Sequence, residues 1–142
     1  MLIHPQNEEA DWPYTAKSEQ CNHALEAYGT VGVAEYDPVV KNSVSQLKAA
    51  IDLTVVTVTI EADQTVFQMY QSGVLDSADC GTNLDHAVAA VGYGTEDGKD
   101  YYIVRNSWGP SWGDKGYIKI AAIDGGPGIC GIQMDSLYAT TN

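Results

Sequence analysis

The stretch that most constrains the fold runs from Asn83 to Gly109, where two strand-like segments flank a turn. Residues 87–91 form a small apolar run, and residues 101–104 are aromatic and β-branched, a composition typical of strands. Between them, residues 94–98 supply the Asp-Gly turn chemistry that antiparallel hairpins use. The sequence therefore predicts one β-hairpin.

The register of this hairpin predicts that a histidine faces an asparagine. If the loop is centred near Glu96, Tyr93 opposes Lys99 and His86 opposes Asn106. Directly opposed residues of an antiparallel pair have Cβ atoms about 5 Å apart on the same face. We therefore expect the Asn106 amide oxygen to accept a hydrogen bond from the His86 ring and to hold that ring in one tautomer.

An imidazole oriented by a neutral amide suits a thiol nucleophile better than a hydroxyl. The amide fixes the ring without adding negative charge, and a thiol is acidic enough to give its proton to histidine in the resting state. A histidine on an apolar strand is more often structural, so Asn106 is what favours a catalytic His86. Asp85 and His86 point to opposite faces of a strand and cannot chelate one ion together, so we expect no metal there. We also expect no cofactor.

Two passages, His86 to Gly94 and Asn106 to Ile118, strongly resemble the C-terminal part of papain-like cysteine proteases, the cathepsin L and papain group. The resemblance extends to residues 12–16, 67–74 and 130–132 and covers the chain from about Glu8 onward. It implies that His86 and Asn106 are catalytic. It also implies that Trp108, supported by Trp112, covers their hydrogen bond. The alternative is that both indoles are core residues, and we expect each to be partly so.

The resemblance implies an α+β fold in which residues 1–142 are one domain, the antiparallel, barrel-like right-hand domain with short helices. Residues 1–10 are expected to be a flexible start. Asn42-Ser43 is expected to cap a short helix that carries Val44, Leu47, Ala50 and Ile51 on one face. Residues 136–140 are expected at the sheet edge. The family's N-terminal half, with the nucleophilic cysteine in a Gly-Ser-Cys-Trp setting, has no counterpart here.

Three cysteines cannot all pair within the chain. By the resemblance, Cys80 and Cys130 form a disulfide, and Cys21 matches a half-cystine whose partner lies in the absent half. A catalytic Cys21 is the alternative. It is disfavoured because Glu19 stands nearby, where negative charge opposes a thiolate, and because no helix signature follows.

The chain is acidic, with seven basic and nineteen acidic residues and a formal charge of -12. This charge repels nucleic acid and anionic membranes, so neither is an expected partner. One interpretation is that the acidic residues form an ordinary solvated surface. The other is that the protein works at low pH, in a lysosome, a vacuole or a secreted fluid. Residues 1–4 lack the pattern of a signal peptide and resemble an added Met at an internal cut. His4 and His23 are expected to face solvent.

Three functional interpretations remain open. The chain is part of a cysteine endopeptidase, or a non-catalytic relative that binds peptides or inhibitors, or one chain of a two-chain protease. Expected partners are peptide or protein substrates, the missing N-terminal half or a propeptide, and cystatin-type inhibitors. The resemblance also implies a substrate pocket with an apolar preference that tolerates basic residues, in which Asp135 either forms the floor or turns into solvent. Its residues are Leu84, Asp85, Ala87, Thr59 and Asp135.

Overall fold

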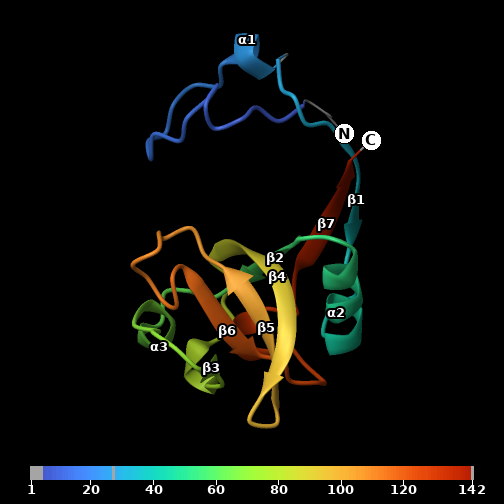
Figure 1. The fold of residues 1–142 in the computed structure, drawn as a ribbon, viewed down its shortest axis with the longest axis vertical. Helices are drawn as coiled ribbons and strands as arrows, with labels where there is room; N and C mark the ends of the chain where they lie inside the picture. The colour runs from blue at the N-terminus through green and yellow to red at the C-terminus, as the bar shows by residue number, and fades with distance from the viewer. Residues whose placement is uncertain (1–4, 27, 142) are drawn as a thin grey trace. The chain divides into compact units, whose positions relative to one another are not determined.

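The computed structural model describes residues 5–26 and 28–141 of the chain. They fall into two compact units, which are described in turn (Figure 1). The first unit comprises Met1–Tyr36 and Ala139–Asn142, and the second comprises Asp37–Tyr138. Among the described residues no buried hydrophobic side chain precedes Val39, so the hydrophobic core belongs to the second unit.

The first unit has little regular structure. It contains the short helix α1 (His23–Glu26) and an antiparallel bridge in which Gln6 N donates to Val31 O at 2.7 Å. His23 is exposed, as predicted. His4 and the first four residues of the expected flexible start lie outside the described residues.

The sheet has seven strands in the order β1-β7-β2-β4-β5-β6-β3. It is mixed, because β3 runs parallel to β6, whereas the pairs β2–β4, β2–β7, β4–β5 and β5–β6 are antiparallel. The α+β class is confirmed, although this order describes an open sheet and not a closed barrel. The strands are β1 (Val33–Pro38), β2 (Val56–Ile60), β3 (Val74–Leu75), β4 (His86–Glu96), β5 (Lys99–Arg105), β6 (Tyr117–Ala121) and β7 (Ser136–Thr141).

Two predictions about the elements beside the sheet have opposite outcomes. Helix α2 (Val44–Leu53) begins after Ser43, whose side chain accepts from Gln46 N at 3.4 Å, so the predicted cap is confirmed. The expected edge position of residues 136–140 is wrong, because β7 lies between β1 and β2. Helix α3 (Thr65–Gln68) and the 3₁₀ turns η1 (Ala78–Cys80) and η2 (Ile129–Gly131) complete the fold.

The turn of the central hairpin consists of Asp97 and Gly98, with φ values of 51° and 76°. Left-handed backbone at both positions is the geometry of a type I′ turn, which Asp-Gly favours. Glu96 therefore pairs with Lys99, and the predicted loop centre at Glu96 is wrong.

This tighter turn changes the pairing along the hairpin. Tyr93 faces Tyr102 and not Lys99, and the register shifts again between Ala90 and Gly92. Strand β5 ends at Arg105, so the next residue lies beyond the ladder. His86 and Asn106 are therefore not opposite each other in the ladder, and the predicted cross-strand pairing is wrong. Their side chains nevertheless contact each other.

A disulfide joins the two 3₁₀ turns beside the core. Cys80 in η1 and Cys130 in η2 are bonded, which confirms the pairing implied by the resemblance. Both half-cystines are almost fully buried, whereas Cys21 is a free, exposed thiol. The core between these turns and the sheet contains Phe67, Leu47, Val56, Val58, Ile60, Tyr102, Val104, Ile118, Ile120 and Ile132.

Candidate active site

A histidine and an asparagine meet where β4 begins and β5 ends. His86 Nε2 and Asn106 Oδ1 are 2.9 Å apart. His86 is held by its pairing with Ile60 on β2, and Asn106 by its backbone N–H, which donates to Gly116 O at 2.9 Å. The predicted side-chain contact is therefore present, formed across a strand end and not within the ladder.

The surrounding hydrogen bonds fix the histidine tautomer. Ser107 N donates to Asn106 Oδ1 at 2.7 Å. Since a backbone N–H can only donate, the amide atom that faces Ser107 is the oxygen, and it is the same atom that faces His86. His86 Nε2 must therefore carry a proton, which leaves Nδ1 as the acceptor of the neutral ring.

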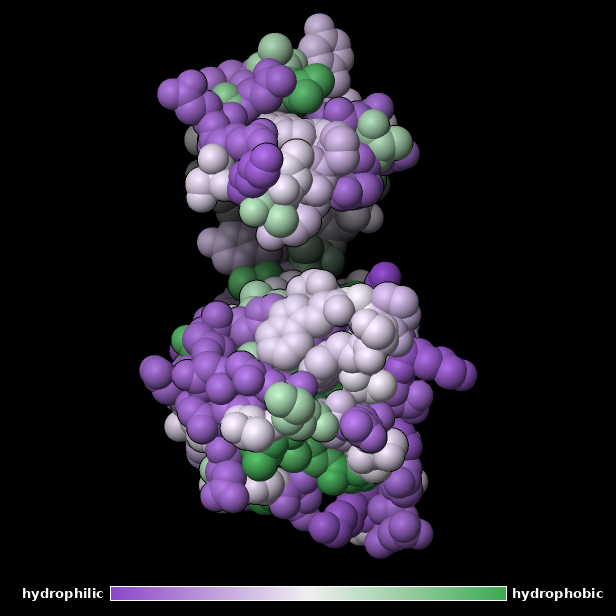
Figure 2. All heavy atoms as spheres, turned by 90° about the vertical axis from the view of Figure 1, so that its left-hand side faces the viewer, coloured by the Kyte–Doolittle hydropathy of each residue, from purple (hydrophilic) through white to green (hydrophobic). Residues whose placement is uncertain are grey.

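An indole covers this hydrogen-bonded pair. The Trp108 ring is stacked on His86 with centroids 5.2 Å apart and 27° between the planes. Trp108 in turn meets Phe67 and Trp112 edge-on, at 5.5 and 5.4 Å. It remains 40% exposed. Figure 2, which faces the α3 side of the second unit, shows pale and green side chains gathered between purple margins.

The Asn106 amide is not fully satisfied within the described residues. Its side chain is only 7% exposed, and Nδ2 has no hydrogen-bond partner there. An unpaired buried donor costs about 1–3 kcal/mol of folding free energy. Stability alone therefore does not favour an asparagine at this position, which is consistent with a chemical role for its oxygen.

Two carboxylates hold the chain that leads into His86. Glu61, just after β2, is 6% exposed and accepts from Asn83 N and from Gln64 Nε2, the latter at 2.9 Å. Asp85 Oδ1 accepts from Ala62 N at 2.8 Å. These bonds join the end of β2 to the three residues before His86.

The Glu61 contacts predict a pH-dependent stability. The Asn83 N–H bond lowers the pKa of Glu61 below its ordinary value. A carboxylate whose pKa is lower in the folded state stabilises the protein above its unfolded pKa, and this contribution is lost as pH falls through the folded pKa. We expect the free energy of unfolding of the native chain to fall more steeply between about pH 5 and 3 than that of Glu61→Gln.

Urea unfolding at a series of pH values measures this difference. Glu35→Gln, at an exposed glutamate, is the matched control and should follow the native curve. If the free energy of unfolding of Glu61→Gln depends on pH as that of the native chain does, the contacts of Glu61 do not stabilise the fold.

The structure brings together part of the predicted substrate pocket. Thr59 pairs with Ala87 across β2 and β4, and Thr59 Oγ1 donates to Asp135 O at 2.9 Å. The Asp135 carboxylate lies 3.7 Å from Lys41 Nζ and is 61% exposed. Leu84 lies against Gly131. The Asp85 carboxylate accepts a hydrogen bond from Ala62 N, a contact that the sequence did not predict.

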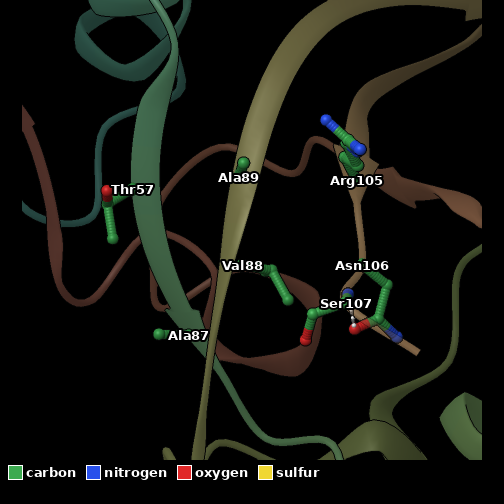
Figure 3. A pocket seen from close by; sticks show the side chains of 7 residues that line it. All are labelled: Thr57, Ala87, Val88, Ala89, Arg105, Asn106 and Ser107. Atoms are coloured by element: carbon green, nitrogen blue, oxygen red, sulfur yellow. Dashed lines mark hydrogen bonds between the residues drawn. The ribbon is translucent and has the colours of Figure 1, made fainter. Parts of the chain in front are cut away.

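A pocket of about 390 Å³ lies beside the site, between β2, β4 and the end of β5 (Figure 3). Of the predicted pocket residues only Ala87 lines it. The period-2 alternation of β2 could have indicated Thr57, because it places Thr57 on the same face as Thr59. The lining residues are Thr57, Ala87, Val88, Ala89, Arg105, Asn106 and Ser107.

Within residues 5–26 and 28–141, no three His, Cys, Asp or Glu side chains are grouped so as to hold a metal ion. None of the helices there is long and apolar enough to cross a membrane.

Residues 3–140 match the family model described as "Papain family cysteine protease". The chain belongs to this family. Its open α+β sheet is thus the papain-like fold that the sequence predicted.

Relatives and solved structures agree with this membership. The chain is 50% identical over 131 residues to "Probable cysteine protease RD21B" of Arabidopsis thaliana, covering 92% of this chain and 28% of the relative. Identity to chymopapain of Carica papaya is 43%, covering 89% and 36%. The bromelain protease of Ananas comosus, solved with the E64 inhibitor, superposes with a TM-score of 0.89 at 39% identity, covering 98% of this chain and 64% of that one. The chain spans less than half the length of these two curated relatives and corresponds to their C-terminal region.

Proposed function

We propose that this chain is the C-terminal domain of a papain-type cysteine endopeptidase, with His86 as general base and acid and Asn106 as the residue that orients it. The hydrogen bond from His86 Nε2 to Asn106 Oδ1 carries the proposal. It leaves Nδ1 as the basic nitrogen, and a base held by a third group is the arrangement that activates a nucleophile.

In the proposed reaction a cysteine from the N-terminal part of the protease gives its proton to His86 Nδ1. The thiolate attacks the peptide carbonyl carbon, and the imidazolium donates its proton to the leaving amine, so that a thioester between the cysteine and the acyl group remains. A water molecule next gives a proton to Nδ1 and attacks the thioester carbonyl. The acid is released, and the cysteine sulfur takes the proton back from the imidazolium as the thiol. Throughout, Asn106 accepts from Nε2 and keeps Nδ1 directed at the reacting groups.

The 142-residue chain alone is expected to have no peptidase activity. Its single free thiol, Cys21, belongs to the first unit, and the proposed nucleophile is not part of this sequence. Hydrolysis of a fluorogenic cathepsin-type peptide measures this directly. Robust cleavage that Cys21→Ser abolishes would contradict both the proposal and the assignment of Cys21 as a half-cystine.

The proposed partners and compartment follow the same assignment. Peptide or protein substrates, the N-terminal half or a propeptide, and cystatin-type inhibitors would bind the face around His86. A disulfide and a net charge of -12 suit an oxidising, acidic setting such as a lysosome, a vacuole or a secreted fluid.

We also propose that Leu84, Ala87 and Thr59 form an apolar substrate pocket and that Asp135 stands at its margin. The ion pair with Lys41 and the exposure of the Asp135 carboxylate support this arrangement. Asp135→Ala is therefore expected to change the ratio of Arg to Leu cleavage at the second residue before the scissile bond by less than about twofold, because exposed ion pairs contribute little. The ratio of kcat/KM values in a protease completed with an N-terminal half measures this, with Lys41→Ala as control. A tenfold fall in the ratio would place the Asp135 carboxylate inside the pocket.

A further inference from the structure

Gln133 is a buried polar side chain that the proposed mechanism does not use. It is 3% exposed and stands two residues before Asp135. Its Nε2 donates to Ile123 O at 3.2 Å and to Gly126 O at 2.8 Å, and its Oε1 accepts from Tyr102 OH at 3.1 Å. Because backbone carbonyls only accept, the amide atom that faces Ile123 and Gly126 is the nitrogen, and the orientation of the amide is fixed.

These bonds attach a surface loop, residues 123–128, which we call the strap, to the core. Most strap residues are exposed, whereas Tyr102 on β5 is fully buried. The backbone N–H of Gln133 also donates to Pro127 O at 2.9 Å. Where the strap passes the amide, a Cβ on Gly128 would lie 2.9 Å from Gln133 Cδ, and Gly128 has a φ of 72°. Glycine suits this position on both counts, so the strap closes tightly over the Gln133 side chain.

The segment that begins at Gln133 continues into the proposed substrate pocket. Gln133 O accepts from Asn42 N at 2.7 Å. Two residues later, Asp135 O accepts from Thr59 N at 3.0 Å and from Thr59 Oγ1 at 2.9 Å. Residues 133–135 are therefore held at one end by the Gln133 amide and at the other by Thr59, a residue of that pocket.

The middle residue of this segment lies beside a second pocket residue. Leu84 Cδ2 and Met134 Sδ are the side-chain atoms nearest to the position that a Cβ on Gly131 would occupy, at 2.7 and 3.1 Å. Met134 N donates to Gly131 O at 2.9 Å. A displacement of residues 133–135 would therefore change the packing beside Leu84 as well as the bonds to Thr59.

The network around Gln133 is complete in its donors. Both amide hydrogens and the Tyr102 hydroxyl hydrogen are used. Burial raises the pKa of Tyr102 above its ordinary value, so the hydroxyl keeps the hydrogen that it donates. A buried network whose members are satisfied makes the groups that it joins rigid, whereas removal of one member leaves buried polar atoms without partners.

We propose that Gln133 is a positioning residue for the substrate pocket. Its buried amide fixes residues 133–135 against Thr59 and so sets how strictly the pocket selects among apolar side chains. The inference rests on the proposed function, because the pocket of Thr59, Leu84 and Ala87 is part of that proposal.

The first test compares two peptides, with Val or Phe as the second residue before the scissile bond, in the chain completed with a cysteine-bearing N-terminal part. Gln133→Leu leaves the strap carbonyls and the Tyr102 hydroxyl without partners, so the loosened pocket should admit the larger side chain. The ratio of kcat/KM for Phe to that for Val is expected to rise about fivefold. The change should lie in KM, with kcat within about twofold, since His86 and Asn106 are untouched. Gln46→Leu, the same change at an exposed position of α2, is the control and should keep the native ratio.

The second test needs no activity and uses the 142-residue chain itself. Amide hydrogen exchange of Thr59 N–H, which donates to Asp135 O, is expected to be about tenfold faster in Gln133→Leu than in the native chain. Asn106 N–H is the internal control and should exchange at the native rate, because it is bonded away from this network. Tyr102→Phe removes only one hydroxyl and should give a smaller acceleration at Thr59, so the prediction can be checked even if Gln133→Leu does not fold.

Native exchange at Thr59 in the folded variants overturns the proposal. Equal acceleration at Thr59 and Asn106 shows only a global loss of stability and also overturns it. Faster exchange at Thr59 with an unchanged ratio of Phe to Val cleavage overturns the role in selectivity. Failure of the proposed function would appear separately, as a completed native protein that cleaves neither peptide, and exchange at Thr59 would then still decide whether Gln133 positions the segment.

Discussion

Replacing His86 by alanine, in the chain completed with a cysteine-bearing N-terminal part, is expected to lower kcat/KM for peptide hydrolysis by at least about four orders of magnitude. The physical reason is that Nδ1 is the acceptor left free by the bond between Nε2 and Asn106 Oδ1. Without the ring, no group takes the thiol proton or returns it to the leaving amine. Steady-state kinetics with a fluorogenic peptide measure the loss.

Asn106→Ala is the companion variant and should lose less activity than His86→Ala, since the imidazole remains but is no longer oriented. Circular dichroism should show that both variants fold, because His86 is only partly buried and Asn106 Nδ2 has no partner among the described residues. A folded His86→Ala protein with activity within tenfold of the native enzyme would exclude His86 as the base.

Removal of the disulfide is expected to have the largest effect on stability. Cys80 and Cys130 are 50 residues apart, and a cross-link over such a loop lowers the entropy of the unfolded chain enough to stabilise the fold by about 4 kcal/mol. The double change Cys80→Ala, Cys130→Ala should therefore lower the free energy of unfolding by roughly this amount. Urea unfolding followed by tryptophan fluorescence measures it.

Cys21→Ser is the matched control for that experiment. Its thiol is exposed and unpaired, so its replacement should change the free energy of unfolding by less than about 0.5 kcal/mol. A double variant as stable as Cys21→Ser would show that the cross-link contributes nothing to the fold.

The sequence predicted the contact between His86 and Asn106 through a register that the structure corrects. The patterns of residues 87–91 and 101–104 are local and sufficed for two strands. Register depended on whether the turn contains two residues or more, and on a shift between Ala90 and Gly92 that no local pattern indicated. The two side chains meet because Asn106 leaves the ladder and is held by Gly116 O.

Other parts of the site depend on contacts that are remote in sequence. The Asp135 carboxylate is positioned by its ion pair with Lys41. The Asp85 carboxylate is positioned by the hydrogen bond that it accepts from the backbone N–H of Ala62. By contrast, the Ser43 cap rests on a single local hydrogen bond and could be predicted from its neighbours.

The pH dependence of cysteine alkylation tests most directly whether His86 accepts the proton of the catalytic thiol. The measurement uses the completed protease with Cys21→Ser and follows inactivation by iodoacetamide from pH 4 to 8. We predict fast alkylation that persists far below the ordinary thiol pKa of about 8.5, because transfer of the proton to His86 yields a thiolate. His86→Ala should move the rate profile towards that ordinary pKa. Identical profiles for the two proteins would contradict the assignment of His86 as the base.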